Sequence, residues 1–256
     1  MPEEEPVRRG SGIPGGRFGI VARLTRHELK TDELAARLAT AKQFFAHRRK
    51  TITAGAGTAL LLLGASLGIF LYVRSRQAKA AEAFSLALAG YHGFVTPNPP
   101  PTLTVPHFKT AEEKYKEGLQ KFSDVSSQFR WYRQGRWARY YAALCQRELG
   151  KNAEAEKELA AIAKEGDPDL AALSKMALAA LYQQTSRGGE AEKIYRELES
   201  HPTLMVPKPA VQIALAELYH KTNPPQATAL YKQIEKEYSG TAAGDQASKM
   251  LRSSAN

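Results

Sequence analysis

Residues 51–73 read TITAGAGTALLLLGASLGIFLYV and carry no charged side chain. A helix over this stretch would extend roughly 34 Å at about 1.5 Å per residue, enough to cross a hydrocarbon core of about 30 Å. Basic side chains bound it at residues 48–50 and at Arg74 and Arg76. A helix buried in a soluble core is the alternative, which the glycines in the stretch and its lack of a polar face disfavour. The sequence therefore predicts a single transmembrane helix over 51–73.

The flanks of the span indicate how it is inserted. Arg74-Ser75-Arg76 follows it directly, where a cleavable signal peptide would carry small residues, so we expect an uncleaved anchor. Five Lys or Arg residues lie among the 20 positions before the span, and three lie among the 20 positions after it. The positive-inside rule therefore favours a cytoplasmic N-terminus and an extracytoplasmic C-terminal part.

The segment before the span divides into two parts. Residues 1–20 are rich in Gly, Pro and charge and have little to bury, so we expect a disordered tail over 1–30. Apolar residues recur at helical spacing at 34, 38, 41 and 45, which predicts a basic amphipathic juxtamembrane helix over 31–50. That helix would either lie on the membrane or dock on a partner, or it would act only as a stop beside the span.

Within the span, Gly64 and Gly68 form a small-residue pair on which a second transmembrane helix could pack, although glycine is common in membrane helices in any case. After the span, residues 77–88 are Ala-rich and contain no helix breaker, so we expect the helix to continue into solution. Five prolines between 97 and 106 then favour an extended loop. Residues 74–107 are thus predicted as a helical extension followed by a Pro-rich loop.

From Phe108 onward the sequence has helical periodicity, no strand-like run, and an internal repeat. Ala155, Ala191 and Ala227 are spaced 36 residues apart. Larger apolar residues follow each of them by four and by seven positions: Leu159, Tyr195, Tyr231, Ile162, Leu198 and Ile234. A weaker earlier copy has Ala111 and Tyr115. Because a small residue lets two helices approach and a large one fills the gap to the next pair, such units stack into a solenoid.

Over roughly 108–238 these residues resemble the tetratricopeptide repeat. Ala143, Gly150, Ala179 and Tyr182 match further positions of that family's consensus. The sequence departs from it in a period of 36 rather than about 34 residues, in Ile or Leu where the family has Ala, and in a short turn at 223–225. The resemblance implies an all-α protein with a tetratricopeptide-like solenoid of about three to four helical hairpins over 108–256, closed by a C-terminal capping helix.

In that family the first helix of each hairpin lines a concave groove that binds peptides. The resemblance gives this role to a set that mixes apolar and polar side chains, which suits a loosely selective polypeptide ligand. The set is Trp137, Tyr140, Leu144, Arg147, Leu173, Met176, Ala180, Gln183, Glu217, His220 and Lys221.

Arg130, Arg133 and Arg136 recur at every third residue among aromatic residues. One interpretation is an amphipathic helix with a solvated arginine face. The other is the basic rim of a peptide-binding surface, because Arg and aromatic residues dominate binding hot spots. The net charge of +10 is spread along the chain without a dense Lys/Arg block, so we expect no binding of nucleic acid.

The sequence contains no motif typical of catalysis or metal binding. Its six histidines are scattered without a pair at metal-ligand spacing, and it has neither a phosphate-binding loop nor a nucleophile elbow. The single cysteine, Cys145, lies in an apolar run and is expected to be a packing residue. We therefore expect no enzymatic activity, no cofactor, no metal site and no small-molecule substrate.

The layout of a basic segment, one anchor and a repeat domain is similar to the ancillary subunit of the bacterial Sec translocon and its relatives. That resemblance implies a bacterial inner-membrane protein whose repeat domain is periplasmic and binds partner or exported client polypeptides, in a chaperone-like way. The alternative is a structural scaffold subunit of a cell-envelope complex. The expected partners are therefore other proteins and the lipid bilayer.

Overall fold

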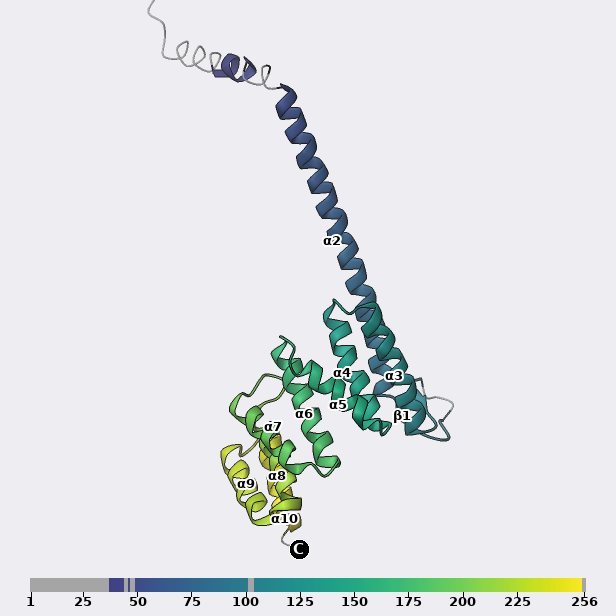
Figure 1. Cartoon of the computed structure of the whole chain (residues 1–256), viewed down its shortest axis with the longest axis vertical. Coiled ribbons are helices and arrows are strands. Elements are labelled where there is room, and N and C mark those ends of the chain that lie inside the picture. Colours follow the sequence, from purple (N-terminus) through teal and green to yellow (C-terminus); the bar gives the residue numbers. More distant parts are fainter. Residues whose placement is uncertain (1–36, 44–45, 47–48, 101–103, 255–256) are drawn as a thin grey trace, which may run out of the picture. The chain divides into compact units, whose positions relative to one another are not determined.

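The computed structural model describes residues 37–43, 46, 49–100 and 104–254, and these are almost entirely helical (Figure 1). The prediction of an all-α protein is confirmed. The chain separates into two compact units, Met1–Ile69 and Phe70–Asn256. The tail expected over 1–30 lies outside the described residues. Residues 37–43, within the segment predicted as a juxtamembrane helix, are helical and exposed.

Helix α2 (Arg49–Tyr91) contains the predicted span, and within the described residues it is the one helix long and apolar enough to cross a membrane. Its large apolar side chains between 60 and 73 are exposed. The hydroxyls of Thr58 and Ser66 donate to the carbonyls of Ala54 and Leu63 at 3.0 Å, so these polar groups are satisfied within the helix. Internal satisfaction of polar groups is what a hydrocarbon environment requires.

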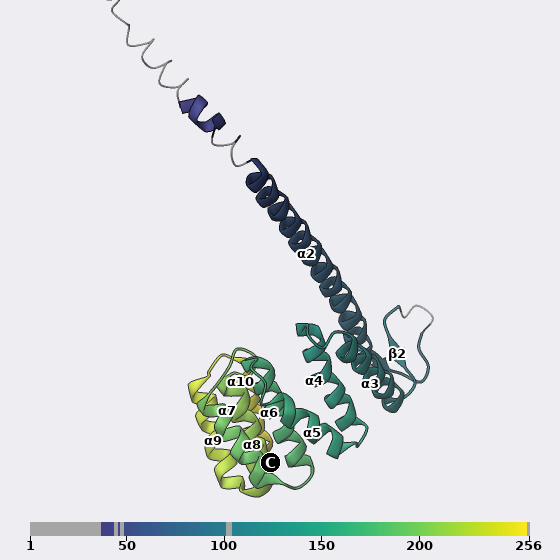
Figure 2. The same cartoon turned by 45° about the horizontal axis from the view of Figure 1, so that its top comes forward.

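The C-terminal part of α2 packs against helix α3 (Ala111–Gln128). Ala80 and Ala87 are fully buried at this contact, because their small side chains let the two helices approach closely. Ring contacts run in opposite order along the two helices, with Phe84 6.0 Å from Phe122 and Tyr91 6.1 Å from Tyr115. The helices are therefore antiparallel, as both views show (Figure 1, Figure 2).

This packing differs from the predicted boundary of the folded domain. The helical extension was expected to belong with the Pro-rich loop, and the domain was expected to begin at Phe108. The structure instead places α2 from Phe70 onward in the same compact unit as the later helices. The physical reason is that Ala80, Phe84 and Ala87 form one apolar face, which α3 and α4 cover.

The two ends of the Pro-rich loop pair with each other. Strand β1 (Phe94–Val95) pairs in parallel with strand β2 (His107–Phe108), a short sheet that the sequence did not predict. Gly93 is required at the entry, since a Cβ there would lie 2.7 Å from the carbonyl oxygen of Pro106. The side chain of Phe108 is buried, so the pairing fixes the end of the loop against the helices.

Seven further helices follow α3. Their bounds are α4 (Arg133–Glu148), α5 (Asn152–Ile162), α6 (Pro168–Gln184), α7 (Gly188–Ser200), α8 (Lys208–Thr222), α9 (Pro224–Glu237) and α10 (Ala242–Ser254). Several ends follow from local sequence. Thr110, Asp167 and Asn223 cap helix N-termini through their side chains, and Gly150 has the positive φ that ends α4. Each helix packs mainly against its neighbours in the sequence, as in helical repeats.

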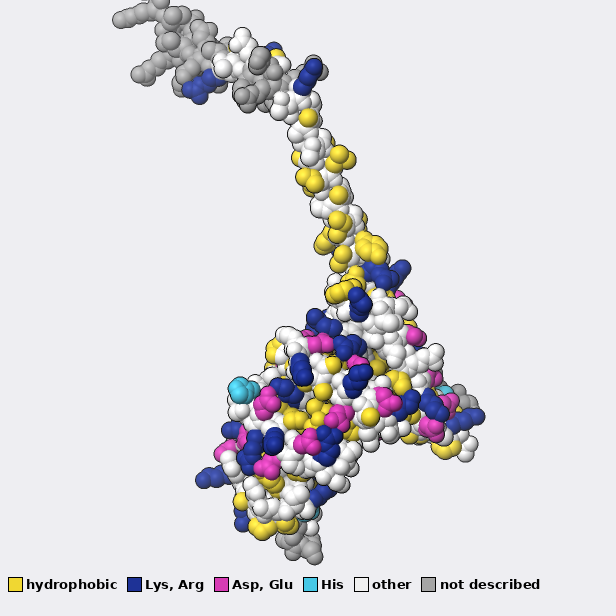
Figure 3. Space-filling model, viewed as in Figure 1, with side chains coloured by type: hydrophobic (Ala, Val, Ile, Leu, Met, Phe, Trp, Pro, Cys, Tyr) yellow, Lys and Arg dark blue, Asp and Glu magenta, His cyan; other side chains and the backbone are white. Residues whose placement is uncertain are grey.

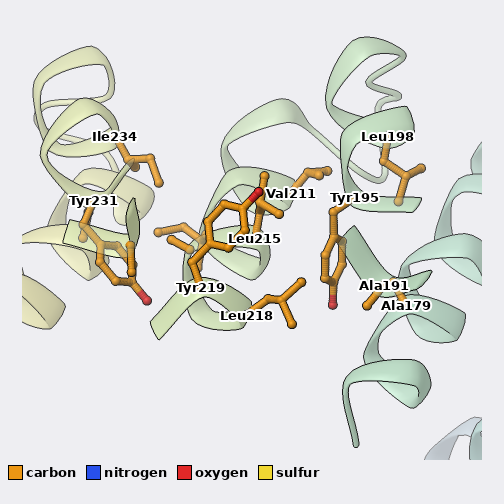
Figure 4. Packing of buried hydrophobic residues seen from close by; sticks show 14 of the residues in the cluster. Ala179, Ala191, Tyr195, Leu198, Val211, Leu215, Leu218, Tyr219, Tyr231 and Ile234 are labelled. Carbon is orange, nitrogen blue, oxygen red and sulfur yellow. The ribbon is translucent and has the colours of Figure 1, made fainter. Parts of the chain in front are cut away.

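The repeated residues form the core between these helices. Ala155, Ala191 and Ala227 are at most 1% exposed, and all six of the larger residues that follow them are buried. Figure 4 shows Tyr195 and Tyr231 entering the layers on either side of α8, where Val211, Leu215 and Tyr219 lie between them. The spacing read from the sequence therefore corresponds to one equivalent packing position on α5, α7 and α9.

Candidate functional site

A hollow of about 310 Å³ opens between α2 and the first turns of α4. Its lining comes from two elements that lie far apart in the sequence: Phe84 on α2, and Arg133, Gln134, Trp137 and Tyr141 on α4. The last four recur at intervals of one, three and four residues, which places them on one side of the helix. The hollow combines three aromatic rings, one amide and one guanidinium group.

Two of the residues that line this hollow each have a buried polar atom without a hydrogen-bond partner: the acceptor Gln134 Oε1 and the donor Trp137 Nε1. A buried polar group without a partner costs about 1–3 kcal/mol, so such a pair invites a ligand or water that satisfies it. The guanidinium of Arg133 lies 5.6 Å from the centre of the Trp137 ring, in cation–π contact. The residues around the hollow thus include one unsatisfied donor, one unsatisfied acceptor and a positive charge beside apolar surface.

Trp137 is the predicted groove residue that lines this hollow. Two other candidates on α4, Tyr140 and Leu144, are only 9% and 8% exposed and belong to the core beneath α5 and α6. The prediction that they line a groove is wrong, because their side of α4 is covered by the next helical pair. Burial also raises the pKa of Tyr140 to about 12. Arg147 is half-buried and paired with the neighbouring Glu148 at 2.6 Å.

The candidates on α6 are half-buried. Leu173 and Met176 pack against the core with part of each side chain accessible. Ala180 is also half-buried, and Gln183 accepts a hydrogen bond of 3.4 Å from the Tyr195 hydroxyl. This part of the predicted groove is therefore mostly apolar and already engaged with the core on one side.

The candidates on α8 are exposed. Glu217, His220 and Lys221 all face solvent, and Glu217 accepts a hydrogen bond of 3.2 Å from Gln246 on α10. The helix predicted as a C-terminal cap thus lies beside α8. The structure does not bring the three sets of candidates into a single hollow. Trp137 alone of these eleven lines the hollow beside α2.

The arginine stripe is also different from the prediction. Arg130 lies in the α3–α4 turn and not on a helix, because α4 begins at Arg133. Its guanidinium stacks on the ring of Trp131 at 4.5 Å. Arg136 is exposed at the end of the first turn of α4. The three residues therefore do not form one helix face, although all three are exposed around the same turn.

Phe84, Gln134 and Tyr141 are the lining residues that sequence reasoning missed. Phe84 lies between Ala80 and Ala87, so a large residue follows a small one by four positions, as in the repeats. That signal was available in the sequence of the helical extension. The sequence around Gln134 gave no such signal, since an amide among arginines is typical of a solvated helix face.

Other polar clusters bind the helices together. The Arg187 guanidinium contacts Glu156 at 2.7 Å and Glu190 at 2.7 Å, and it stacks on the Tyr182 ring. Hydrogen bonds from Arg187 and Tyr182 hold the pKa of Glu156 below its usual value, against the opposing effect of desolvation. Arg139 pairs with Glu158 and Glu165 and thereby connects α4 with α5 and the turn after it.

Cys145 is fully buried where α4 crosses α3, and burial raises the pKa of its thiol to about 12. A Cβ on Gly118 would lie 3.1 Å from its Sγ, so the two helices meet closely at this point. Within the described ranges, no group of three or more His, Cys, Asp or Glu residues is arranged to hold a metal ion.

Comparisons of this chain with protein-family models, with curated proteins and with solved structures found no match.

Proposed function

We propose that this chain is a membrane-anchored, tetratricopeptide-like repeat protein that binds partner or client polypeptides. The equivalent burial of the small and large residues on α5, α7 and α9 supports the repeat assignment. A long apolar helix that leads directly into the repeat unit supports the anchor. In this proposal the anchor lies in a bacterial inner membrane with the N-terminus cytoplasmic and the repeats periplasmic, near the secretion machinery.

The observation that carries polypeptide binding is the pair of unsatisfied polar atoms on Gln134 and Trp137, two residues that line the hollow beside α2. An extended polypeptide presents one N–H donor and one C=O acceptor per residue. Gln134 Oε1 can accept from such a donor, and Trp137 Nε1 can donate to such an acceptor. The rings of Phe84, Trp137 and Tyr141 supply apolar surface for a side chain of the ligand. Binding of this kind needs no catalytic residue and no cofactor.

Photo-crosslinking in intact membranes tests the proposal. A photoreactive amino acid replaces Trp137 or Met176 in the full chain, and the adducts are identified by mass spectrometry. The control position is Lys157, which is exposed on α5. Diverse exported polypeptides at positions 137 and 176, and not at 157, are the expected result. The same adducts at all three positions would contradict a specific binding surface.

A substitution of Gln134 separates binding from folding. Gln134→Leu removes an acceptor that has no partner in the free chain, so we expect the thermal stability of the free protein to stay the same or rise. If a polypeptide satisfies that acceptor, crosslinking from position 137 should fall by about tenfold, the effect of roughly 1.4 kcal/mol. Exposed Gln233 on α9, changed to Leu, is the matched control.

A structural scaffold subunit is the second candidate function. A Cβ built on Gly64 or Gly68 would meet nothing within 4 Å apart from its chain neighbours and the nearby backbone of its own helix, so both positions are open to another helix. Gly64→Leu together with Gly68→Leu should then release one stoichiometric partner from the purified complex. Loss of that partner with unchanged crosslinking at Trp137 would favour the scaffold over client binding.

A further inference from the structure

The α3–α4 turn, residues 129–132, lies beside the part of α2 that directly follows the apolar stretch. Arg76 donates from Nη2 to the carbonyl oxygen of Gln128 at 3.2 Å, and its guanidinium lies 4.8 Å from the centre of the Phe129 ring. Arg76 comes three residues after Val73, which corresponds to about 4.5 Å along the helix axis. The turn therefore lies beside the first turns of α2 that follow the predicted span.

This turn is rigidly built. Phe129 is buried, and its carbonyl accepts a hydrogen bond of 2.8 Å from the amide of Tyr132. Gly135 lets the start of α4 close over the turn, because a Cβ there would lie 2.1 Å from the carbonyl oxygen of Phe129. The ring of Tyr132 packs at 6.3 Å from that of Phe129. The two anchored aromatic residues hold the backbone on both sides of Trp131.

Trp131 is nevertheless 82% exposed. An indole of this exposure on a rigid turn gives no packing energy to the fold, and tryptophan is enriched where membrane and water meet. The next exposed aromatic side chains on α2 are Phe70 and Tyr72, at the end of the apolar stretch. Exposed aromatic side chains thus occur both on α2, at the end of the apolar stretch, and on the α3–α4 turn.

Exposed basic side chains accompany the indole on the turn and on the helices beside it. Arg130 stacks on Trp131, Arg133 and Arg136 follow on the first turns of α4, and Arg74 lies on α2; all four are exposed. Within the part of the chain that the structure describes, none of them forms an ion pair with a carboxylate. Dark blue Lys and Arg side chains follow directly after the yellow apolar side chains of α2 (Figure 3). Guanidinium groups in this position match the phosphates of lipid headgroups.

We propose that the α3–α4 turn is a second membrane contact, in which Trp131 inserts among the lipid headgroups and the surrounding arginines bind the phosphates of anionic phospholipids. The proposal rests on the proposed membrane span and goes beyond it, since α2 alone would let the helical unit rotate about the axis of α2. Two contact points fix the face of that unit that meets the bilayer. Arg130, Arg133 and Arg136, which the sequence predicted as a peptide-binding rim, then bind lipid phosphates.

Fluorescence quenching of the full chain in vesicles tests the contact, because Trp131 and Trp137 are the only tryptophans in the sequence. Trp137→Phe leaves Trp131 as the single reporter, and Trp131→Phe leaves Trp137. Both variants are reconstituted in vesicles of phosphatidylcholine and phosphatidylglycerol in equal parts, with bromine at the headgroup end or at the far end of the acyl chains. We expect headgroup-end bromine to quench Trp131 about twofold or more, and to quench Trp131 more strongly than Trp137.

Arg130→Gln together with Arg133→Gln tests the charge. Each arginine near an anionic surface is worth roughly fivefold in lipid affinity, so the pair should abolish the excess quenching of Trp131 in anionic over neutral vesicles. Lys232→Gln with Lys236→Gln on α9 removes the same formal charge and should leave it intact. Vesicle flotation is measured in parallel. A chain that floats with unquenched Trp131 would overturn the second contact alone, whereas a chain that does not float would overturn the span as well.

Discussion

Replacement of Phe122 by alanine tests whether α2 is part of the folded unit. Phe122 is fully buried on α3, and its ring lies 6.0 Å from Phe84, 6.0 Å from Tyr91 and 5.1 Å from Tyr141. Two of these three neighbours belong to α2. Truncation of a buried phenylalanine costs about 3–5 kcal/mol, through lost transfer energy and through the cavity that remains.

The expected change in melting temperature follows from the size of the unit. For a domain of this size 1 kcal/mol corresponds to a shift of about 2–4 °C, so a cost of about 4 kcal/mol predicts a decrease of about 8–16 °C. The assay is thermal unfolding of the full chain in detergent, followed by near-ultraviolet circular dichroism. Phe94→Ala is the matched control, since Phe94 is 61% exposed and its loss should cost less than about 0.5 kcal/mol.

A double-mutant cycle assigns the effect to the contact with α2. If Phe84 and Phe122 pack as observed, the two alanine substitutions should show a coupling free energy of about 0.5–1.5 kcal/mol. Additive effects, with a coupling energy near zero, would show that α2 does not pack on α3. A decrease for Phe122→Ala no larger than that for Phe94→Ala would refute the assignment of Phe122 to the core.

Three further predictions concern single side chains. Tyr231→Phe removes a buried hydroxyl that has no hydrogen-bond partner, so the free energy of unfolding should stay unchanged or rise. Tyr219→Phe instead removes the hydrogen bonds of 2.6 Å to Glu192 and 2.7 Å from Arg196, and it should lower the free energy of unfolding by about 2 kcal/mol. Urea denaturation of the two variants measures the difference. The Cys145 thiol, with a pKa of about 12, should resist iodoacetamide at neutral pH in the folded chain and react in urea, and equal rates would contradict its burial. Glu156 has a pKa lowered by Arg187, so its stabilising effect is present above its unfolded pKa of about 4.3 and is lost as pH falls through the lower folded value. Glu156→Gln should therefore flatten the decrease in melting temperature between about pH 5 and pH 3, and an unchanged slope would speak against the ion pair.

The repeat positions show why residue spacing within a helix correctly predicted the core residues. Ala191 and Tyr195 lie on the same side of one helix because four residues make about one turn, and no distant contact is needed to place them there. Their burial then follows from the hydrophobic effect once a neighbouring helix is available. For the same reason the short turn at 223–225, at which Asn223 caps α9 in the structure, could be placed from the sequence.

The candidate site shows where local pattern was insufficient. Tyr140 and Trp137 lie three residues apart on α4, yet the first is buried under the next helical pair and the second lines a hollow. The difference depends on how far each neighbouring helix extends over α4. That extent depends on packing between elements and is not encoded in the spacing along α4 itself.

The sequence by itself determined the helical character of the chain, the long apolar helix and the equivalence of the repeated core positions. Each of these depends on composition or on intervals of a few residues, which fix the face of a helix directly. Only the tertiary structure decided that α2 packs into the repeat unit, that its Phe84 completes a hollow with α4, and that Arg130 lies in a turn beside Arg76. These features join residues about 50 positions apart, and they arise because small residues at Ala80 and Ala87 allow two helices to meet.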